Sequence, residues 1–349
     1  MMVGGNNSGA PTTARPNNRG MIATPRKLDR GDLVYVAYLL LPFRWFLQLG
    51  RPLGWLEMLM HPRLRRQVRA SMEQAFGSTK SPGELATLTR HVFEYHQMRS
   101  LMLLAAPLMT VRGQLEKYFP LRNLEELDRV LKEGKGAMIL SSHINSVGGL
   151  LAIIQLRRRG YPVRSPMPDR NDAWAPTPFR RMIHRIFGAP NMIDAIDAFH
   201  AQFNVRPLIR ELEANNILTL VGDGWHSASF ADASFLGRTL PFTTGPLAIA
   251  RVANVPVVPL FNVGAPHRMH FEFEPAFKVD RTGNQVDDVA RAVRFYIGRV
   301  EQRMLADIPC WQHWMEGDVF ALMERWRGRT LSERYATGAA RTEEVAGRT

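Results

Sequence analysis

The stretch that decides the fold is Gly136 to Gly149, with the sequence GAMILSSHINSVGG. Its first part, Ala137 to Leu140, is a short apolar run that follows a glycine, as expected for a buried strand of an α/β sheet. A second apolar segment, Leu150 to Leu156, ends in three arginines, the charge that the C-terminus of a helix favours. The stretch therefore predicts a strand followed by a helix.

Between these two segments lies a polar cluster. Ser141, Ser142 and His143 follow the strand directly, and Asn145 and Ser146 are candidate N-caps of the helix. His143 is then expected just past the carboxyl end of a strand, where ligands and catalytic groups gather in open α/β sheets. The alternative is a capping or core histidine.

The charge of the chain predicts acidic partners. The 349 residues, enough for one large or two modest domains, carry a formal net charge of +13, and most of the cations are arginines. Guanidinium groups bind phosphate in a bidentate manner, so an anionic membrane, a phosphorylated lipid or an acidic carrier protein fits better than a neutral partner. Nucleic acid is not expected, because the sequence has no zinc-ligand spacing and no ribonucleoprotein motif. A single cysteine, Cys310, excludes an internal disulfide.

The N-terminal part of the chain divides by composition. Residues 1–27 are rich in Gly, Asn, Pro and Thr and are expected to form a disordered tail without a signal peptide. Leu33 to Met60 is aromatic and leucine-rich, but charges and prolines interrupt it before the roughly 20 residues that a membrane span needs. With the basic segment His61 to Arg69 it predicts interfacial helices of a peripheral membrane protein. A helical hairpin packed on the protein's own core is the alternative.

The remaining elements alternate between helix and strand. Helices are expected at 82–109, 124–132, 150–156, 205–214, 246–252 and 286–305, and strands at 137–140, 161–164, 217–221, 255–261 and 269–277. This order predicts an α/β protein, with a helical region at 28–120, an α/β domain at 121–327 and a disordered tail at 328–349.

Three further motifs follow the central stretch. Asp223 lies between two glycines at the end of the strand at 217–221, again at the carboxyl edge of the sheet. Phe235 to Arg238 is an apolar edge that turns at a glycine, and Thr243 to Pro246 is a helix start with a proline in the first turn. A turn aspartate alone is usually structural.

Taken together, these motifs resemble the bacterial late lipid A acyltransferases and the related phosphatidylinositol mannoside acyltransferases of the lysophospholipid acyltransferase superfamily. The resemblance runs from about Leu33 to Met315 and includes the Ser-Ser-His block, Asp223, the Phe-Leu-Gly-Arg turn, the Thr-Thr-Gly-Pro helix start and the pair Pro309 and Trp311. It implies a central mixed β-sheet flanked by helices, with an N-terminal helical membrane-attachment region.

The resemblance also implies an activity: transfer of a fatty acyl chain from acyl-ACP or acyl-CoA to a hydroxyl of a lipid or glycolipid, at the cytoplasmic face of the inner membrane. His143 is then the general base and Asp223 its support, with no metal or other cofactor. Arg181 or Arg185 would match the arginine of the family downstream of the histidine. Arg238, Thr244 and Gly245 are carried over from the family's motifs as further substrate-binding residues.

One departure from the family pattern affects the active site. The family has an acid five residues after the histidine, which orients the imidazole, and here that residue is Gly148. Three hypotheses follow: another acid (Asp169, Asp172 or Asp223) replaces it, the histidine acts unassisted on a less demanding acceptor, or catalysis is lost and the chain is a lipid-binding or scaffold protein. The last predicts no carboxylate within hydrogen-bonding reach of His143.

Overall fold

The structure is a computed structural model that describes residues 29–167, 177–200, 204–225 and 227–329. The helices and strands of the N-terminal part are α1 (Arg30–Leu40), α2 (Phe43–Gln48), α3 (Gly50–Met60), α4 (Pro62–Phe76), α5 (Pro82–Val111), α6 (Gln114–Tyr118), β1 (Leu121–Arg122) and α7 (Glu125–Leu131). The middle contains β2 (Ala137–Ser141), α8 (Val147–Arg158), β3 (Val163–Met167), α9 (Pro178–Phe187), α10 (Met192–Ile196), β4 (Ala198–His200), α11 (Val205–Glu213) and β5 (Ile217–Val221). The C-terminal part contains β6 (Phe230–Phe235), β7 (Arg238–Thr243), α12 (Gly245–Ala253), β8 (Val257–Val263), β9 (His270–Phe273), α13 (Gln285–Ala306) and α14 (Val319–Arg327). The described residues also form the 3₁₀ turns η2 (Pro266–Arg268), η3 (Ile308–Cys310) and η4 (Gln312–Glu316).

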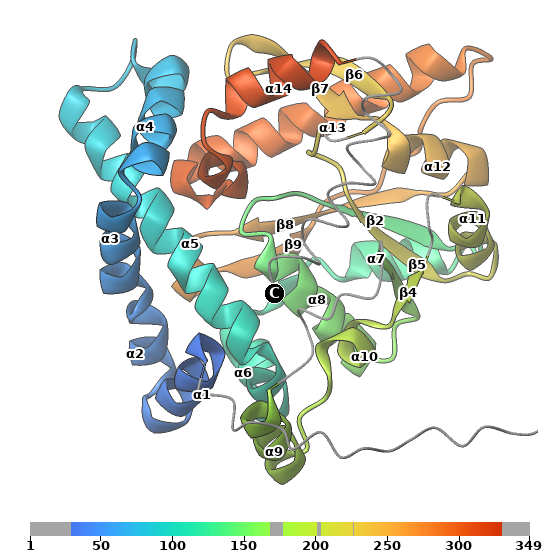
Figure 1. Ribbon diagram of the computed structural model, residues 1–349. Helices are drawn as coiled ribbons and strands as arrows, with labels where there is room; N and C mark the ends of the chain where they lie inside the picture. The colour runs from blue at the N-terminus through green and yellow to red at the C-terminus, as the bar shows by residue number, and fades with distance from the viewer. Residues whose placement is uncertain (1–28, 168–176, 201–203, 226, 330–349) are drawn as a thin grey trace, which may run out of the picture.

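A mixed sheet forms the centre of the molecule (Figure 1). Within the described residues its strand order is β1-β9-β8-β2-β5-β3-β4. The strands from β8 to β4 are parallel to one another, whereas β9 is antiparallel to β8 and parallel to β1. The predicted central mixed sheet flanked by helices is therefore confirmed.

The alternating side chains of β2 separate two apolar cores. Met138 and Leu140 point into a core shared with α4, α13 and α14, whereas Ala137 and Ile139 point into a core shared with α1, α2 and α8. Both faces of this strand are buried, which explains why its sequence is a continuous apolar run rather than an alternating one.

The N-terminal helices line one side of the molecule (blue to cyan in Figure 1). Helix α3 packs closely on α5, because Gly50 and Gly54 of α3 leave room for Met98 and for the backbone of Glu94. A capping box at Ser81 and Glu84 begins α5, as a cap at this place in the sequence predicts. No helix in the described part of the chain is long and apolar enough to cross a membrane.

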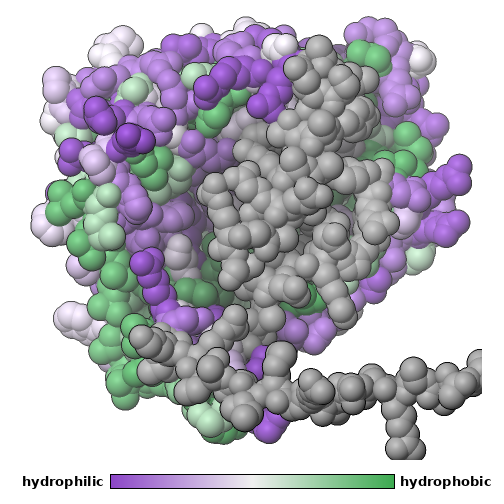
Figure 2. Space-filling model, viewed as in Figure 1, coloured by the Kyte–Doolittle hydropathy of each residue, from purple (hydrophilic) through white to green (hydrophobic). Residues whose placement is uncertain are grey.

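These helices bury one face and expose apolar side chains on the other. Tyr35, Phe46 and Leu47 are buried, while Trp45 and Leu40 are 71% and 76% exposed. Figure 2 shows apolar surface at the lower left, where Figure 1 places α1 to α3. The exposed large apolar residues of these helices are Leu33, Val36, Leu40, Trp45, Leu53, Trp55, Leu56, Leu59 and Met60. These helices therefore pack on the core of the protein and also expose apolar side chains, and their attachment to a membrane stays a prediction.

Several predicted boundaries shift. The strand predicted at 161–164 is β3 at Val163–Met167, and the strand predicted at 269–277 is only four residues long in β9. Helix α9 begins at a Thr177 cap in a segment for which no element was predicted. The predicted tails at 1–27 and 328–349 lie almost wholly outside the described residues.

Candidate functional site

Two neighbouring parallel strands bring His143 and Asp223 together. Strands β2 and β5 pair in register up to Ser141 and Val221, and the amide of Gly222 donates to the carbonyl of Ser141 across 2.9 Å. The loops that leave the two strands therefore begin side by side. His143 lies two residues past the end of β2 and Asp223 two residues past the end of β5.

The Asp223 carboxylate accepts hydrogen bonds from three directions. The Nδ1 atom of His143 lies 2.7 Å from Oδ1, the amide of His143 lies 2.9 Å from both oxygens, and the indole Nε1 of Trp311 lies 3.0 Å from Oδ2. Asp223 is fully buried, whereas the side chain of His143 is 28% exposed. The buried acid therefore fixes both the backbone and the ring of a histidine that faces the surface.

This environment fixes the protonation of the pair. Burial alone would raise the pKa of Asp223, but the charge of His143 and its hydrogen bonds outweigh burial and lower this pKa to about 2. Burial lowers the pKa of His143, but the charge of Asp223 and their hydrogen bond outweigh it and leave this pKa above its usual value. An ionised Asp223 must accept the Nδ1 proton of the neutral imidazole, so Nε2 carries the free lone pair.

The partner of Asp223 distinguishes it from other buried carboxylates. Asp32, Glu274 and Asp288 are each at most 3% exposed and each form an ion pair with at least one arginine. Such pairs connect segments of the fold, and their arginine partners stay charged at neutral pH. Asp223 instead pairs with a histidine, the side chain whose usual pKa lies nearest neutrality.

A second histidine packs against the first. The rings of His143 and His313 have centroids 4.0 Å apart, and Nδ1 of His313 lies 2.6 Å from a carboxylate oxygen of Glu316. Burial, followed by the charge of His143, lowers the pKa of His313, so this ring is neutral. Its Nε2 is buried and has no hydrogen-bond partner within the described residues.

The loop of η3 and η4 holds these groups in place from the C-terminal side. The amide of Gln312 donates to the carbonyl of His143 across 2.9 Å, and the amide of Asn145 donates to the carbonyl of Cys310 across 2.8 Å. Trp311 is fully buried and packs edge-on against His313, with ring centroids 5.1 Å apart. The loop that contains η3 and η4 thus forms one wall of the site.

At the position of the missing family acid, the structure contains an asparagine side chain. A Cβ atom on Gly148 would lie 2.8 Å from Cγ of Asn262, a buried residue of β8. The Asn262 amide donates to the carbonyls of Ile144 and Asn145, at 2.9 and 3.1 Å. Asp223 lies within hydrogen-bonding reach of His143, so the prediction of the non-catalytic hypothesis is wrong. Asp169 and Asp172 lie outside the described residues.

The predicted arginines lie elsewhere. Arg181 and Arg185 are exposed on α9, which packs on α1 and α5. Their neighbour Arg180 is bound to Asp29 and Asp32 at the start of α1. Their substrate-binding role stays a prediction.

The other predicted substrate-binding residues lie on the β6–β7 hairpin and at the helix start that follows it. The Arg238 guanidinium packs over the ring of Phe320 in α14, 4.9 Å from its centroid, at the hairpin turn. Thr244 is the N-cap of α12 and Gly245 its first residue, and Thr244 makes no side-chain capping bond. The amide of Thr243 donates to the carbonyl of Gly224 across 2.7 Å, so this helix start adjoins the Asp223 turn.

His143, Asp223 and His313 could also hold a metal ion, because their ligand atoms lie within 4.8 Å of one another. However, Nδ1 of His143 and the Asp223 carboxylate already hydrogen-bond each other, and Asp223 has two further N–H donors. These hydrogen bonds already engage both oxygens of Asp223 and Nδ1 of His143. The prediction of a metal-free site stays a prediction.

Sequence reasoning missed the contributions of Trp311, His313 and Glu316. Trp311 was predicted only as part of a family motif, and His313 was not predicted as a site residue. The signal that could have found them is the aromatic stretch CWQHWM, where a histidine lies between two tryptophans outside any predicted element.

The comparisons with known proteins agree with this geometry. The family model for bacterial lipid A biosynthesis acyltransferases matches residues 31–316, most of the chain and all of the site residues above. A search of curated proteins found no match. By this match, the chain belongs to the bacterial lipid A biosynthesis acyltransferase family.

Proposed function

We propose that the protein transfers a fatty acyl chain from an acyl thioester to a hydroxyl of a lipid or glycolipid, with His143 as general base and Asp223 as the residue that orients it. The observation that carries this proposal is the 2.7 Å contact between His143 Nδ1 and a fully buried carboxylate. In this arrangement Asp223 supplies what the missing family acid at position 148 would supply.

The reaction follows from the tautomer of His143. The acceptor hydroxyl oxygen attacks the thioester carbonyl carbon while Nε2 of His143 takes the hydroxyl proton, and Asp223 stabilises the imidazolium that forms. The tetrahedral intermediate then collapses and its C–S bond breaks. His143 returns the proton to the departing sulfur, so the products are an ester and a free thiol.

The oxyanion formed in this step needs nearby positive potential. Helix α8 begins at Val147, four residues after His143, and its N-terminal end favours negative charge. We assign the oxyanion to this end of α8. Such preorganised dipoles act strongly in a site that excludes water.

The lipid acceptor suggests where the protein works. The exposed apolar residues of α1 to α3 and the basic α4 that follows them combine the two signals that stable peripheral attachment to a membrane requires. We propose that this face lies in the cytoplasmic surface of the bacterial inner membrane, where acyl-ACP or acyl-CoA is the donor.

The test is acyl transfer from labelled acyl-CoA and acyl-ACP to a panel of bacterial lipids and glycolipids. We expect His143→Ala to lower turnover by roughly 10²–10⁴-fold. The matched control is His91→Ala, a partly exposed histidine on α5 whose removal is expected to leave turnover unchanged. Equal turnover of wild type and a folded His143→Ala would contradict the proposal. Lipid binding without transfer across the panel would favour a binding protein instead.

A further inference from the structure

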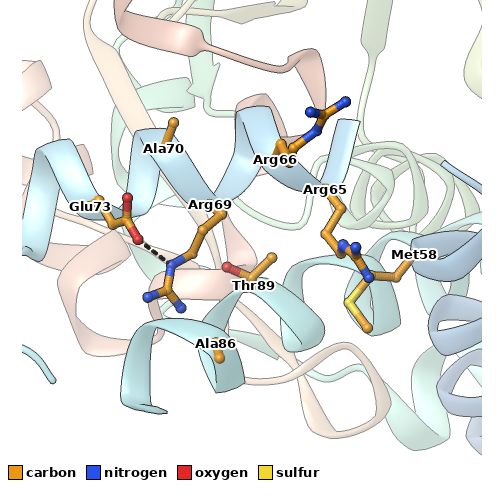
Figure 3. A pocket seen from close by; sticks show the side chains of 8 residues that line it. All are labelled: Met58, Arg65, Arg66, Arg69, Ala70, Glu73, Ala86 and Thr89. Atoms are coloured by element: carbon orange, nitrogen blue, oxygen red, sulfur yellow. Dashed lines mark hydrogen bonds and ion pairs between the residues drawn. The ribbon is translucent and has the colours of Figure 1, made fainter. Parts of the chain in front are cut away.

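A pocket lined by arginines lies between α3, α4 and α5, in helices that carry none of the site residues (Figure 3). Its volume is about 520 Å³, and its lining residues are Met58, Arg65, Arg66, Arg69, Ala70, Glu73, Ala86 and Thr89. In Figure 3, Arg65 and Arg69 extend from α4 toward α5, and Arg65 lies beside Met58 of α3. We propose that this pocket binds the phosphate of an anionic phospholipid.

The charge of the pocket fits a phosphodiester. Arg69 is held on both sides, because it pairs with Glu73 at 2.6 Å and donates to the carbonyl of Pro82 at 2.9 Å. Neither Arg65 nor Arg66 forms an ion pair with any described residue. In Figure 3 the guanidinium groups of Arg65 and Arg69 lie on the α5 side of α4, whereas that of Arg66 extends to the other side. A planar guanidinium presents a fork of donors that matches phosphate oxygens.

The apolar part of the lining favours a lipid over free phosphate. Met58, Ala70 and Ala86 give the pocket an apolar wall next to its arginines, as an amphiphile requires. Thr89 adds no free donor, since its hydroxyl donates to the carbonyl of Leu85. The ligand thus needs both a phosphate and an apolar portion.

The position of the pocket indicates the same ligand. It lies where the exposed apolar residues of α3 end, at Leu59 and Met60, and where basic α4 begins at Pro62. If α3 lies in the acyl layer, the first turns of α4 lie at the depth of the lipid phosphates. This step rests on the proposed membrane attachment.

The experiment is co-sedimentation with vesicles of phosphatidylcholine alone or of equal parts phosphatidylcholine and phosphatidylglycerol. We expect wild type to prefer the anionic vesicles and Arg65→Gln/Arg66→Gln to lose about tenfold or more of that affinity. The matched control is Arg206→Gln/Arg210→Gln, which removes two exposed arginines from α11 and changes the net charge equally. We expect this control to change affinity less than about twofold.

A second pair of variants separates a pocket from a general basic surface. Ala86→Leu fills the pocket without changing any charge, whereas Thr87→Leu adds the same side chain at an exposed neighbour that does not line it. We expect only Ala86→Leu to weaken the preference for phosphatidylglycerol. Arg65→Lys is expected to weaken it as well, because lysine keeps the charge but lacks the fork.

Each outcome decides between distinct conclusions. If wild type binds neither vesicle, the proposed membrane attachment is wrong. If it binds anionic vesicles but the Arg65/Arg66 and Ala86 variants bind equally well, attachment stands and the pocket assignment is wrong. The last outcome concerns competition by soluble phosphates. Inorganic phosphate or coenzyme A could release the protein from anionic vesicles at a concentration where chloride of equal ionic strength has no effect. That result would overturn the lipid assignment in favour of a soluble phosphate.

Discussion

Replacing Gly148 tests whether Asn262 has taken the place of the family's acid. In Gly148→Ala the new Cβ would lie 2.8 Å from Cγ and 3.0 Å from Nδ2 and Oδ1 of Asn262, where non-bonded carbons prefer about 3.5–4.0 Å. If Asn262 stays, overpacking costs about 1–3 kcal/mol. If it moves, two hydrogen bonds to buried carbonyls are lost, at about 1 kcal/mol each.

The helix propensity of alanine raises the stability of the same variant, Gly148→Ala. Alanine inside a helix is better than glycine by roughly 0.5–1 kcal/mol, which offsets part of the clash. We therefore expect Gly148→Ala to lower the free energy of unfolding by about 1–2 kcal/mol net. The matched control is Gly149→Ala, whose Cβ would meet only Ser141, at an ordinary 3.8 Å. This control gains the propensity without the clash.

The assay is urea unfolding followed by tryptophan fluorescence. The two variants should differ by about 2 kcal/mol, and Asn262→Ala should cancel most of the effect of Gly148→Ala in a double-mutant cycle. Gly148→Asp should be at least as destabilising and should not raise turnover, because Nδ1 of His143 is already engaged by Asp223. Equal stability of the two alanine variants, or faster turnover by Gly148→Asp, would refute this reasoning.

The other predictions concern the base itself. Asp223→Asn should lower kcat by about 10³–10⁴-fold at unchanged fold, measured by acyl transfer and circular dichroism, and a loss below tenfold would contradict its role. In the proposed reaction His143 acts as a neutral base, and the charge of Asp223 raises its pKa, so kcat/KM should fall as pH drops through a value above 6.5 and Asp223→Asn should move this midpoint to lower pH. His313→Gln should lower kcat by roughly 10–100-fold with little change in KM, because the ring packed on His143 is lost. Dialysis against a chelator should leave turnover unchanged, and loss that added metal restores would refute metal-free catalysis.

Much of the architecture was predictable, because the central strands are short apolar runs bounded by glycine or polar residues. The strand at 137–140 and the helix at 205–214 were found within one residue of their bounds. Strand β3 begins two residues later than predicted, because Tyr161 and Pro162 lie outside the register that Val163 shares with Ile217. Helix α9 was not predicted, because its segment is rich in prolines and arginines. The segment nevertheless contains a strongly amphipathic helix of ten residues that begins after a Thr177 cap.

The site was predictable in part. His143 was found because it follows a strand, where ligands gather at the edge of a parallel sheet. Asp223 also follows a strand, but its role was predicted from the family resemblance. The contact between Asp223 and His143 depends on strand order, since β2 and β5 are neighbours although 80 residues separate the pair. The packing of His313 on His143 depends on the course of a loop without periodic pattern, so no rule of spacing could predict it.

The wall formed by Trp311 and His313 has a consequence for the order in which the protein matures. During synthesis α1 to α3 leave the ribosome well before Trp311, the residue whose indole completes the hydrogen bonds of Asp223. A nascent chain that already holds its apolar helices and His143 still lacks the indole that binds Asp223 and the loop that binds the His143 carbonyl. If α1 to α3 attach the chain to the bilayer as proposed, they are therefore synthesised before the groups that complete the proposed catalytic base.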